Sequence, residues 1–314
     1  MPLPAVALAA GDPAGIGPEI AFKAALDPAV LAICRPVLFC DRRVLQAHGL
    51  DAGKVNLAQI DMRGELKIGE IAADHGRAAL ACAEAAIRAA LAGEYAAVVA
   101  APHTEAAIHA AGVEFDGYPS FVARVAGLPP EDGILMLCFE HQGREVRIAH
   151  VTLHAGVQRA LRLITKDRIV RTIRAVAAVL DKPRIAVSGV NPHAGEGGAF
   201  GREEIEIVAP AIEQARREGV AVEGPIGADT LIQRAGFDAY VVMLHDQGHV
   251  AAKLLAPQRI AGLTIGTPVP FSSVAHGSAL DIAGKGRASH AAMVEAITRL
   301  VARRRRAVAT AKPS

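Results

Sequence analysis

Residues 5–25, AVALAAGDPAGIGPEIAFKAA, join an apolar run, a glycine-rich turn and an amphipathic segment. Residues 5–9 predict a buried strand, and residues 18–25 predict a helix that starts just after the turn. The same alternation of short apolar runs and helical patterns continues along the chain. It indicates an α/β fold with a mostly parallel sheet that helices cover on both faces.

Further strands and helices are expected along the whole chain. Apolar runs predict strands at residues 36–40, 97–101, 134–138, 147–153, 184–190, 238–244 and 262–266. Helical patterns fall at residues 76–91, 104–110, 166–180, 202–217 and 289–303. The length of 314 residues suggests two domains. Because no Pro/Ser-rich linker divides the chain, these domains are expected to share a cleft and to interrupt each other.

The composition argues against several classes of protein. The formal net charge is only +2, Trp is absent and aromatic residues make up 4%, which disfavours nucleic-acid binding through charge or base stacking. A hydrophobic content of 52% supports a large packed core rather than disorder. The arginine run at residues 303–306 is interpreted as the solvated end of a helix.

No membrane-bound or secreted protein is predicted. Cys34, Cys40, Cys82 and Cys138 lie in apolar runs, as reduced cysteines of a cytoplasmic protein do. The apolar start of the chain lacks a basic region and is interpreted as a first strand, not a signal peptide. No uninterrupted apolar window reaches the length of about 18 residues that a membrane span needs. The expected location is the cytoplasm.

Polar or glycine-rich segments follow five of the predicted strands, at residues 11–19, 102–105, 154, 191–198 and 245–249. The carboxyl ends of parallel strands meet at one edge of a sheet, where open α/β folds bind their ligands. These segments are therefore expected to converge on one cleft, and the pattern predicts an enzyme.

Three histidines, His154, His193 and His245, each stand at or just after the end of a predicted strand. Their wide spacing means that only the fold could bring them together on a metal ion. Three neutral imidazoles with an open position suit a catalytic metal, and they favour Zn²⁺, Fe²⁺ or Co²⁺ over Mg²⁺. The alternative is that each is an ordinary polar residue at a strand end.

Lys253 follows His245 by eight residues. If a helix begins near Gln247, Lys253 lies within two turns of its start and can point toward the cleft. There it could bind a substrate carboxylate or donate a proton. A surface lysine is the alternative.

Residues 275–286, AHGSALDIAGKG, resemble the adenosine-side NAD loop of isopropylmalate and isocitrate dehydrogenases. Neither a P-loop nor a Rossmann glycine motif is present. Together with DPAGIGPE (12–19), NPHAGEGG (191–198) and HDQG (245–248), this loop makes the whole chain similar to the 4-hydroxythreonine-4-phosphate dehydrogenase family.

The resemblance implies two α/β/α domains with a central cleft, as in isocitrate and isopropylmalate dehydrogenases. One domain would comprise residues 1–120 and 268–314, and the other residues 121–267. It further implies a homodimer in which His154, His193 and His245, drawn from both subunits, bind one divalent metal ion, expected to be zinc, with iron, cobalt or manganese as alternatives. The expected catalytic residues are Lys253, Asp246 and Asp229. NAD would contact His276, Gly277, Ser278, Ala279, Asp281, Ile282, Gly284 and Lys285.

Further segments resemble the terephthalate dihydrodiol dehydrogenase branch of that family. They include APHTE (101–105), GYPS (117–120), HVTLH (150–154) and KLLAP (253–257). Gly117–Ser120 stands where the family holds phosphate with a His-Thr pair, and Gly262 and Phe271 replace a substrate-binding Asn and Arg. These departures argue against recognition of a phosphate group. The substrate contacts expected here are Asp12, His103, Tyr118, Ser120, Phe271 and Ser272.

The resulting hypothesis is NAD- and metal-dependent oxidation and decarboxylation of 1,2-dihydroxy-3,5-cyclohexadiene-1,4-dicarboxylate to protocatechuate, in terephthalate degradation. The alternative substrate is a phosphorylated hydroxy acid such as 4-hydroxythreonine-4-phosphate, of the vitamin B6 pathway, or erythronate-4-phosphate. A phosphate acyltransferase of similar fold would lack the three-histidine metal site, and a non-catalytic binding protein would not bind NAD.

Overall fold

The computed structural model describes residues 2–257 and 259–310. Within these residues the strands form a single sheet in the order β3-β2-β1-β4-β11-β10-β5-β6-β9-β7-β8. The strands are β1 (Ala5–Ala9), β2 (Arg35–Cys40), β3 (Leu57–Gln59), β4 (Ala97–Ala100), β5 (Ile134–His141), β6 (Arg144–His150), β7 (Arg184–Ser188), β8 (Ala221–Ile226), β9 (Ala239–Val242), β10 (Ala261–Ile265) and β11 (Phe271–Val274).

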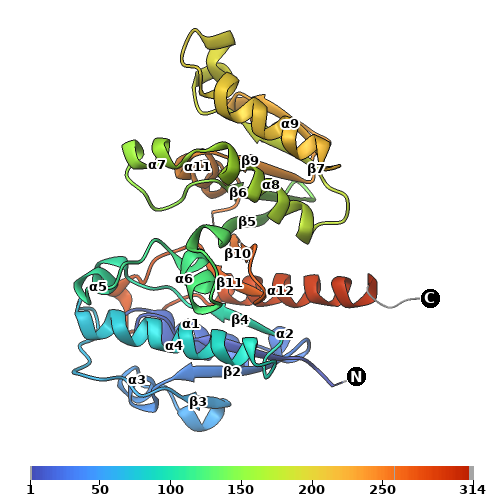
Figure 1. Ribbon diagram of the computed structural model, residues 1–314. Helices are drawn as coiled ribbons and strands as arrows, with labels where there is room; N and C mark the ends of the chain where they lie inside the picture. The colour runs from blue at the N-terminus through green and yellow to red at the C-terminus, as the bar shows by residue number, and fades with distance from the viewer. Residues whose placement is uncertain (1, 258, 311–314) are drawn as a thin grey trace.

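Helices flank this sheet along its length (Figure 1). They are α1 (Gly17–Leu26), α2 (Pro28–Leu31), α3 (Arg42–Ala47), α4 (Ala73–Leu91), α5 (Glu105–Ala110), α6 (Tyr118–Val125), α7 (Val157–Leu163), α8 (Lys166–Val179), α9 (Ala209–Arg217), α10 (Ala228–Leu231), α11 (His245–Leu255) and α12 (Ala291–Thr310). Short helical turns occupy Ala52–Lys54, Pro130–Asp132, Pro192–Gly198 and Leu280–Ile282, and a π-helical turn, Glu204–Val208, precedes α9.

The sheet consists of two parallel blocks joined by antiparallel strands. Strands β3, β2, β1, β4 and β11 run parallel, as do β6, β9, β7 and β8. Between the blocks, β10 and β5 pair antiparallel with each other and with their neighbours β11 and β6. The predicted α/β class with a mostly parallel sheet is therefore confirmed. The antiparallel centre was not predicted.

The first strand shows why its apolar run is continuous. Val6 and Leu8 face a core cluster that includes Ile20 of α1 and Ile297 of α12. Ala7 and Ala9 face the opposite cluster, in which α4 supplies Ile87. Because side chains alternate along a strand and both faces are covered, every position of β1 has to be apolar.

The two blocks appear as a lower and an upper body in Figure 1, and α12 returns the chain to the lower one beside α1. The discontinuous first domain that the resemblance implies, with its approximate boundary between residues 120 and 121, stays a prediction. That boundary falls inside α6. Among the described residues, none of the helices combines the length and apolarity needed to cross a bilayer.

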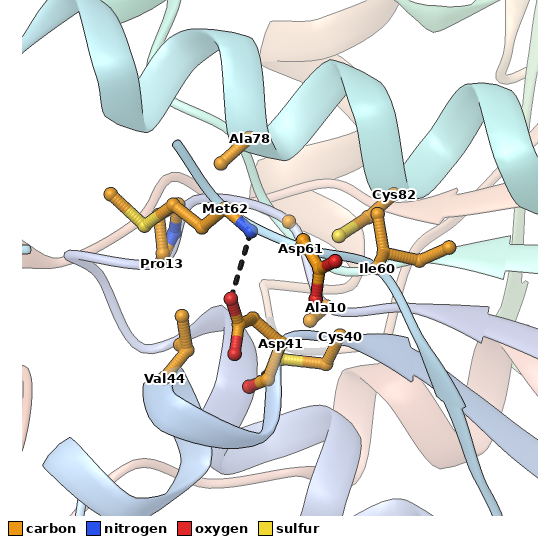
Figure 2. A pocket seen from close by; sticks show the side chains of 11 residues that line it. Ala10, Pro13, Cys40, Asp41, Val44, Ile60, Asp61, Met62, Ala78 and Cys82 are labelled. Atoms are coloured by element: carbon orange, nitrogen blue, oxygen red, sulfur yellow. Dashed lines mark hydrogen bonds between the residues drawn. The ribbon is translucent and has the colours of Figure 1, made fainter. Parts of the chain in front are cut away.

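A small cavity of about 10 Å³ lies where β1 and β2 end (Figure 2). Beside it, the buried Asp41 carboxylate accepts hydrogen bonds from the Met62 N–H at 2.8 Å and from the guanidinium of Arg43. Burial alone would raise the pKa of Asp41. The hydrogen bonds from Arg43 and Met62 outweigh burial and hold that pKa well below its usual range. Asp41 thus ties the end of β2 to the segment that follows β3.

Candidate active site

A cavity of about 330 Å³ opens at the carboxyl ends of β4, β6, β9 and β11. Three of the five polar segments predicted to converge, at residues 102–105, 154 and 245–249, contribute to its lining. The segments at 11–19 and 191–198 do not. The lining residues are Pro102, His103, Glu105, Gly117, Tyr118, Pro119, Leu135, Leu137, Leu153, His154, His245, His249, Lys253, Gly262, Ser273, Val274, Ala275, His276 and Gly277.

His154 pairs with a carboxylate that stands across from it, on the first residue of α5. The distance between His154 Nδ1 and Glu105 Oε1 is 2.9 Å, and His103 Nε2 lies 3.9 Å from the same oxygen. Interactions with His103 and His154 hold the pKa of Glu105 well below its usual range. Since an ionised carboxylate only accepts, this pairing favours a proton on Nδ1 of His154, an arrangement that would leave Nε2 to face another partner.

His245 begins α11 and makes a similar pair. Its Nδ1 lies 2.7 Å from Asp246 Oδ1, and this hydrogen bond lowers the pKa of Asp246. The His245 ring centroid lies 5.5 Å from that of His154. On its other side it stacks on His249, with centroids 3.8 Å apart and planes 8° from parallel. Burial, with the charge of His245 next, lowers the pKa of His249 to about 4.

His150 lies beneath this stack, at the end of β6. Its ring centroid is 4.8 Å from that of His249, and neither ring nitrogen has a hydrogen-bond partner among the described residues. Burial, followed by the charge of His249, lowers the pKa of His150 far below its usual value. A Cβ on Gly248 would lie 2.3 Å from His150 Nε2, so any larger residue at position 248 would force the His150 ring or the helix to shift.

His193 lies in a strained loop away from the cavity. His193, Ala194 and Glu196 all have left-handed backbone, with φ of 50°, 53° and 42°. The base of the loop is held by Glu204, whose Oε1 accepts from the N–H groups of Val190 and Asn191 at 2.7 Å each. The hydrogen bonds of Glu204 therefore fix the start of the loop that carries His193.

Asp229 lies near His193 rather than near the cavity, because both flank Gly227. Among the described residues of this single chain, no group of three or more His, Cys, Asp or Glu is placed to hold a metal ion. One chain therefore brings together His154 and His245, and keeps His193 and Asp229 apart from them.

The three candidate metal histidines share one feature. His193 Nδ1 lies 3.3 Å from Glu196 Oε2, so in each of the three Nδ1 is the ring nitrogen paired with a carboxylate, by a hydrogen bond at His245 and as an ion pair at His154 and His193. Histidines that bind metal ions usually have this arrangement, with the second nitrogen hydrogen-bonded to a carboxylate or carbonyl. The donor chemistry of these residues fits a divalent metal ion.

The predicted substrate contacts divide into two groups. His103 and Tyr118 line the cavity, whereas Asp12, Ser120, Phe271 and Ser272 do not. Phe271 is fully buried, with its ring 5.2 Å from that of Tyr118, and so lies behind the wall instead of forming it.

The other three residues have local structural contacts or lie within the packed interior. Ser120 Oγ donates to Asp116 and to the Gly117 carbonyl. Asp12 Oδ1 accepts from the Ala14 N–H at 2.9 Å. Ser272 is fully buried, and its neighbour Ser273, whose side chain points to the other face of β11, lines the cavity in its place. Phe271, Ser120, Asp12 and Ser272 therefore lie outside the lining of this cavity, and their assignment as substrate contacts stays a prediction.

The segment expected to bind NAD borders the cavity through His276 and Gly277. The Ser278 carbonyl accepts from the Ile16 N–H at 2.8 Å, and Thr104 Oγ1 donates to Ser278 Oγ at 2.9 Å. A Cβ on Gly15 would lie 2.6 Å from Ser278 Cβ, so the glycine-rich turn after β1 packs directly against this segment. The remaining predicted residues, Ala279, Asp281, Ile282, Gly284 and Lys285, follow in a loop with left-handed backbone at Ala279 and Gly284.

Lys253 lines the cavity from α11, which starts at His245 rather than Gln247.

The sequence alone assigns no role to Glu105, His249 or His150. Glu105 and His249 lie in segments that were singled out, but only their contacts across the fold distinguish them from solvated polar residues.

Residues 32–300 match the family model described as "Pyridoxal phosphate biosynthetic protein PdxA". The chain is 42% identical over 307 residues to a 1,2-dihydroxy-3,5-cyclohexadiene-1,4-dicarboxylate dehydrogenase from Comamonas sp, covering 94% of this chain and 96% of that protein. It is 39% identical over 325 residues to "Putative D-threonate 4-phosphate dehydrogenase" of Symbiobacterium thermophilum, covering 94% and 95%.

Solved structures give the same result. A 4-hydroxythreonine-4-phosphate dehydrogenase from Klebsiella pneumoniae superposes with a TM-score of 0.80 at 33% identity, covering 96% of this chain and 99% of that one. A terephthalate 1,2-cis-dihydrodiol dehydrogenase from Burkholderia xenovorans LB400 has a TM-score of 0.66 at 41% identity, covering 95% and 98%. Isocitrate dehydrogenase from Methylococcus capsulatus shares the fold alone, with a TM-score of 0.51 at 17% identity over 97% and 88%. The chain therefore belongs to the PdxA family of dehydrogenases, within the wider isocitrate dehydrogenase-like fold.

Proposed function

We propose that this protein is an NAD- and divalent-metal-dependent dehydrogenase that converts 1,2-dihydroxy-3,5-cyclohexadiene-1,4-dicarboxylate to protocatechuate. The observation that carries the proposal is the make-up of the cavity. Apolar side chains, among them Tyr118, Pro119 and Leu135, suit a six-membered carbon ring, while His103 and Lys253 offer cationic or hydrogen-bonding partners for two carboxylates. The 42% identity to the Comamonas dehydrogenase supports this choice of substrate.

Three histidines would hold the metal ion through Nε2, namely His154 and His245 of one subunit and His193 of another. Zn²⁺ suits an all-imidazole site, and iron, cobalt or manganese are the alternatives. Asp229 would then reach the site together with His193 of the second subunit, because the two residues are neighbours.

A homodimer is proposed because large apolar side chains are exposed on or beside the elements that carry these histidines. Val157 of α7 is 68% exposed and Leu254 of α11 is 78% exposed, and exposed apolar surface of this kind often marks an interface with another protein chain. The further exposed side chains of this kind are Leu161, Phe200, Ile205 and Val250. A second copy of the chain would cover them and complete the metal site.

NAD would bind along residues 276–285, with the exposed Asp281 available for the ribose hydroxyls; such an acidic residue favours NAD⁺ over NADP⁺. When bound, NAD would supply the hydride acceptor, and the metal ion would polarise the substrate oxygens. The substrate carbon that bears hydrogen and a hydroxyl would lose a hydride, its hydroxyl oxygen would lose a proton, and the carbon would become the ketone of a β-keto acid. Loss of CO₂ would then leave the aromatic catecholate, and a proton taken up on its oxygen would give protocatechuate.

The chain's own residues would orient the ring and move the proton. Tyr118 is held in place by its hydroxyl, which donates to the Ala101 carbonyl at 3.3 Å, so it gives the ring a fixed wall. Lys253 faces the cavity two turns into α11 and would bind a carboxylate or donate a proton to the oxygen of the catecholate. Asp246 would act through His245 by fixing the tautomer of that ring.

The alternative function is oxidation of a phosphorylated hydroxy acid. The 39% identity to the Symbiobacterium protein, whose name specifies D-threonate 4-phosphate, favours it. The absence of Arg and Lys other than Lys253 from the cavity lining of the described residues speaks against it, because phosphate recognition usually relies on such side chains.

Turnover of the dihydrodiol, 4-hydroxythreonine-4-phosphate and D-threonate 4-phosphate should be compared by NADH absorbance, with metal-reconstituted enzyme. The expected result is a higher kcat/KM for the dihydrodiol, with protocatechuate and CO₂ as products. A higher kcat/KM for a phosphorylated acid would reject the proposed substrate. Lys253→Ala should lower kcat/KM for the dihydrodiol, while Lys54→Ala, on a turn far along the sheet, serves as the matched control.

A further inference from the structure

We propose that Glu105 is a positioning residue that holds the ring of His154 from the opposite side of the cavity, so that His154 presents Nε2 to the metal ion. The inference rests on the proposed metal site, and it assigns to that site a residue that is not itself a metal ligand. Glu105 is the first residue of α5, after β4, whereas His154 follows β6. The contact thus joins segments that are separated both in sequence and across the sheet.

The pairing with Glu105 favours one tautomer of His154. Nδ1 and Oε1 lie 2.9 Å apart as an ion pair, and because an ionised carboxylate can only accept, it favours a proton on Nδ1. A proton held on Nδ1 leaves Nε2 as the only nitrogen with a free lone pair, and the carboxylate also makes that nitrogen a stronger donor to a metal ion. Without Glu105, the two tautomers and several ring orientations would compete.

The remaining contacts of Glu105 support this role. Among the described residues, the ion pairs of this carboxylate are with His154 and with His103, and none is with Lys or Arg. The His103 ring packs edge-on against Tyr118 with centroids 4.6 Å apart, so His103 belongs to the wall proposed to face the substrate. Glu105 therefore stands between the substrate side of the cavity and the candidate metal ligand.

His154 and His245, the two candidate metal ligands that one chain brings together, each pair with a carboxylate, but the two carboxylates come from different parts of the fold. His245 receives its carboxylate from the adjacent residue, Asp246, whose side chain is 85% exposed. His154 has no acidic neighbour in sequence and depends on a carboxylate from the other block of the sheet. A relative shift of the two blocks would break the second pair and leave the first intact.

The test measures Co²⁺ affinity of the full-length, metal-free protein by calorimetry and by the visible absorption of bound Co²⁺. Wild type is compared with Glu105→Gln, Glu105→Ala, His154→Ala and the double variant Glu105→Ala/His154→Ala. Loss of such a partner typically weakens metal binding about 10–100-fold. We expect Glu105→Ala near the upper end of that range and Glu105→Gln near the lower, because the amide oxygen can still accept from Nδ1. The visible spectrum should change in both.

Three controls make the result specific. Glu114→Gln removes a carboxylate from the segment after α5 and should leave Co²⁺ affinity unchanged, because this exposed side chain has no hydrogen bond or ion pair among the described residues. Thermal unfolding of each metal-free variant detects any loss of fold. In the His154→Ala background, Glu105→Ala should cause no further loss of affinity, because a positioning residue acts only through the ring that it holds.

The outcomes separate the two proposals. If His154→Ala weakens Co²⁺ binding and the Glu105 variants bind like wild type, the role of Glu105 is refuted while the metal site stands. Equal losses from Glu105→Ala in both backgrounds would also refute it. If none of the variants, His154→Ala included, changes Co²⁺ binding, the proposed metal site fails and the role of Glu105 fails with it.

Discussion

Replacing Gly248 by alanine would place a methyl group against the buried ring of His150. The new Cβ would lie 2.3 Å from His150 Nε2 and 3.0 Å from Ile148 Cγ2, well inside van der Waals contact. His150 is only 2% exposed, so its ring has no open space to move into. Either the ring or the first turn of α11, which carries His245 and His249, has to shift.

Two opposing effects set the size of the change. Alanine is favoured over glycine inside a helix by about 1 kcal/mol. Overpacking a filled core costs about 1–3 kcal/mol. Gly248→Ala should therefore lower the free energy of unfolding by up to about 2 kcal/mol. In a His150→Ala background the methyl group has room, and the same substitution should raise that free energy by up to about 1 kcal/mol.

Urea unfolding of the four proteins of this cycle, at one pH and without metal, gives the comparison. Gly156→Ala is the matched control, because a Cβ at that position meets no atom within 4 Å. An equal effect of Gly248→Ala in both backgrounds would show that contact with His150 does not determine the residue at 248. A more stable Gly248→Ala single variant would refute the packing argument outright.

Three further variants test other parts of the molecule. His193→Ala should fold, since its side chain is 66% exposed, yet lose bound metal and most activity; full metal content by elemental analysis would contradict this. Phe271→Arg should destabilise the protein by about 3–5 kcal/mol because it buries an unpaired charge, and a variant that melts like wild type and binds phosphorylated acids would contradict the buried position. Asp41→Asn should lower the free energy of unfolding by about 1.5–3 kcal/mol at pH 7. The pKa of Asp41 is lower in the folded than in the unfolded chain, whose value is about 4, so the difference in unfolding free energy between wild type and Asp41→Asn should reach its full size above pH 4 and shrink as the pH falls below 4. A difference that does not change with pH in urea unfolding would contradict the role of the Asp41 charge.

The strands that the sequence predicts are those with continuous apolar runs. The three that it misses have local reasons to be missed. β3 has only three residues, β8 contains Gly224 and Pro225, and β11 consists of Phe271–Val274 with two serines at its centre. Glycine, proline and serine have low strand propensity, but pairing with neighbouring strands in the sheet outweighs this preference.

The strand that was not predicted explains why the sequence did not show Phe271 as a buried residue. Phe271 can be recognised as inward-facing only when β11 is known to lie between β4 and β10 inside the sheet. Without that strand, sequence position alone suggested a pocket wall. The histidines at strand ends could be predicted, because strand ends are visible in the apolar pattern. The role of Glu105 could not, because it depends on a contact with a residue on another strand connection.

The continuity of the sheet has a mechanical consequence. A hinge between domains usually depends on one or two unpaired segments, but here five residue pairs, from Ala261↔Cys138 to Ile265↔Ile134, join β10 to β5 beneath the cavity. The two blocks can change their relative angle only if the paired strands β10 and β5 bend or twist together. Any opening or closing around a ligand would therefore be small in amplitude, and the bending stiffness of the strands, rather than a flexible linker, would set its energy.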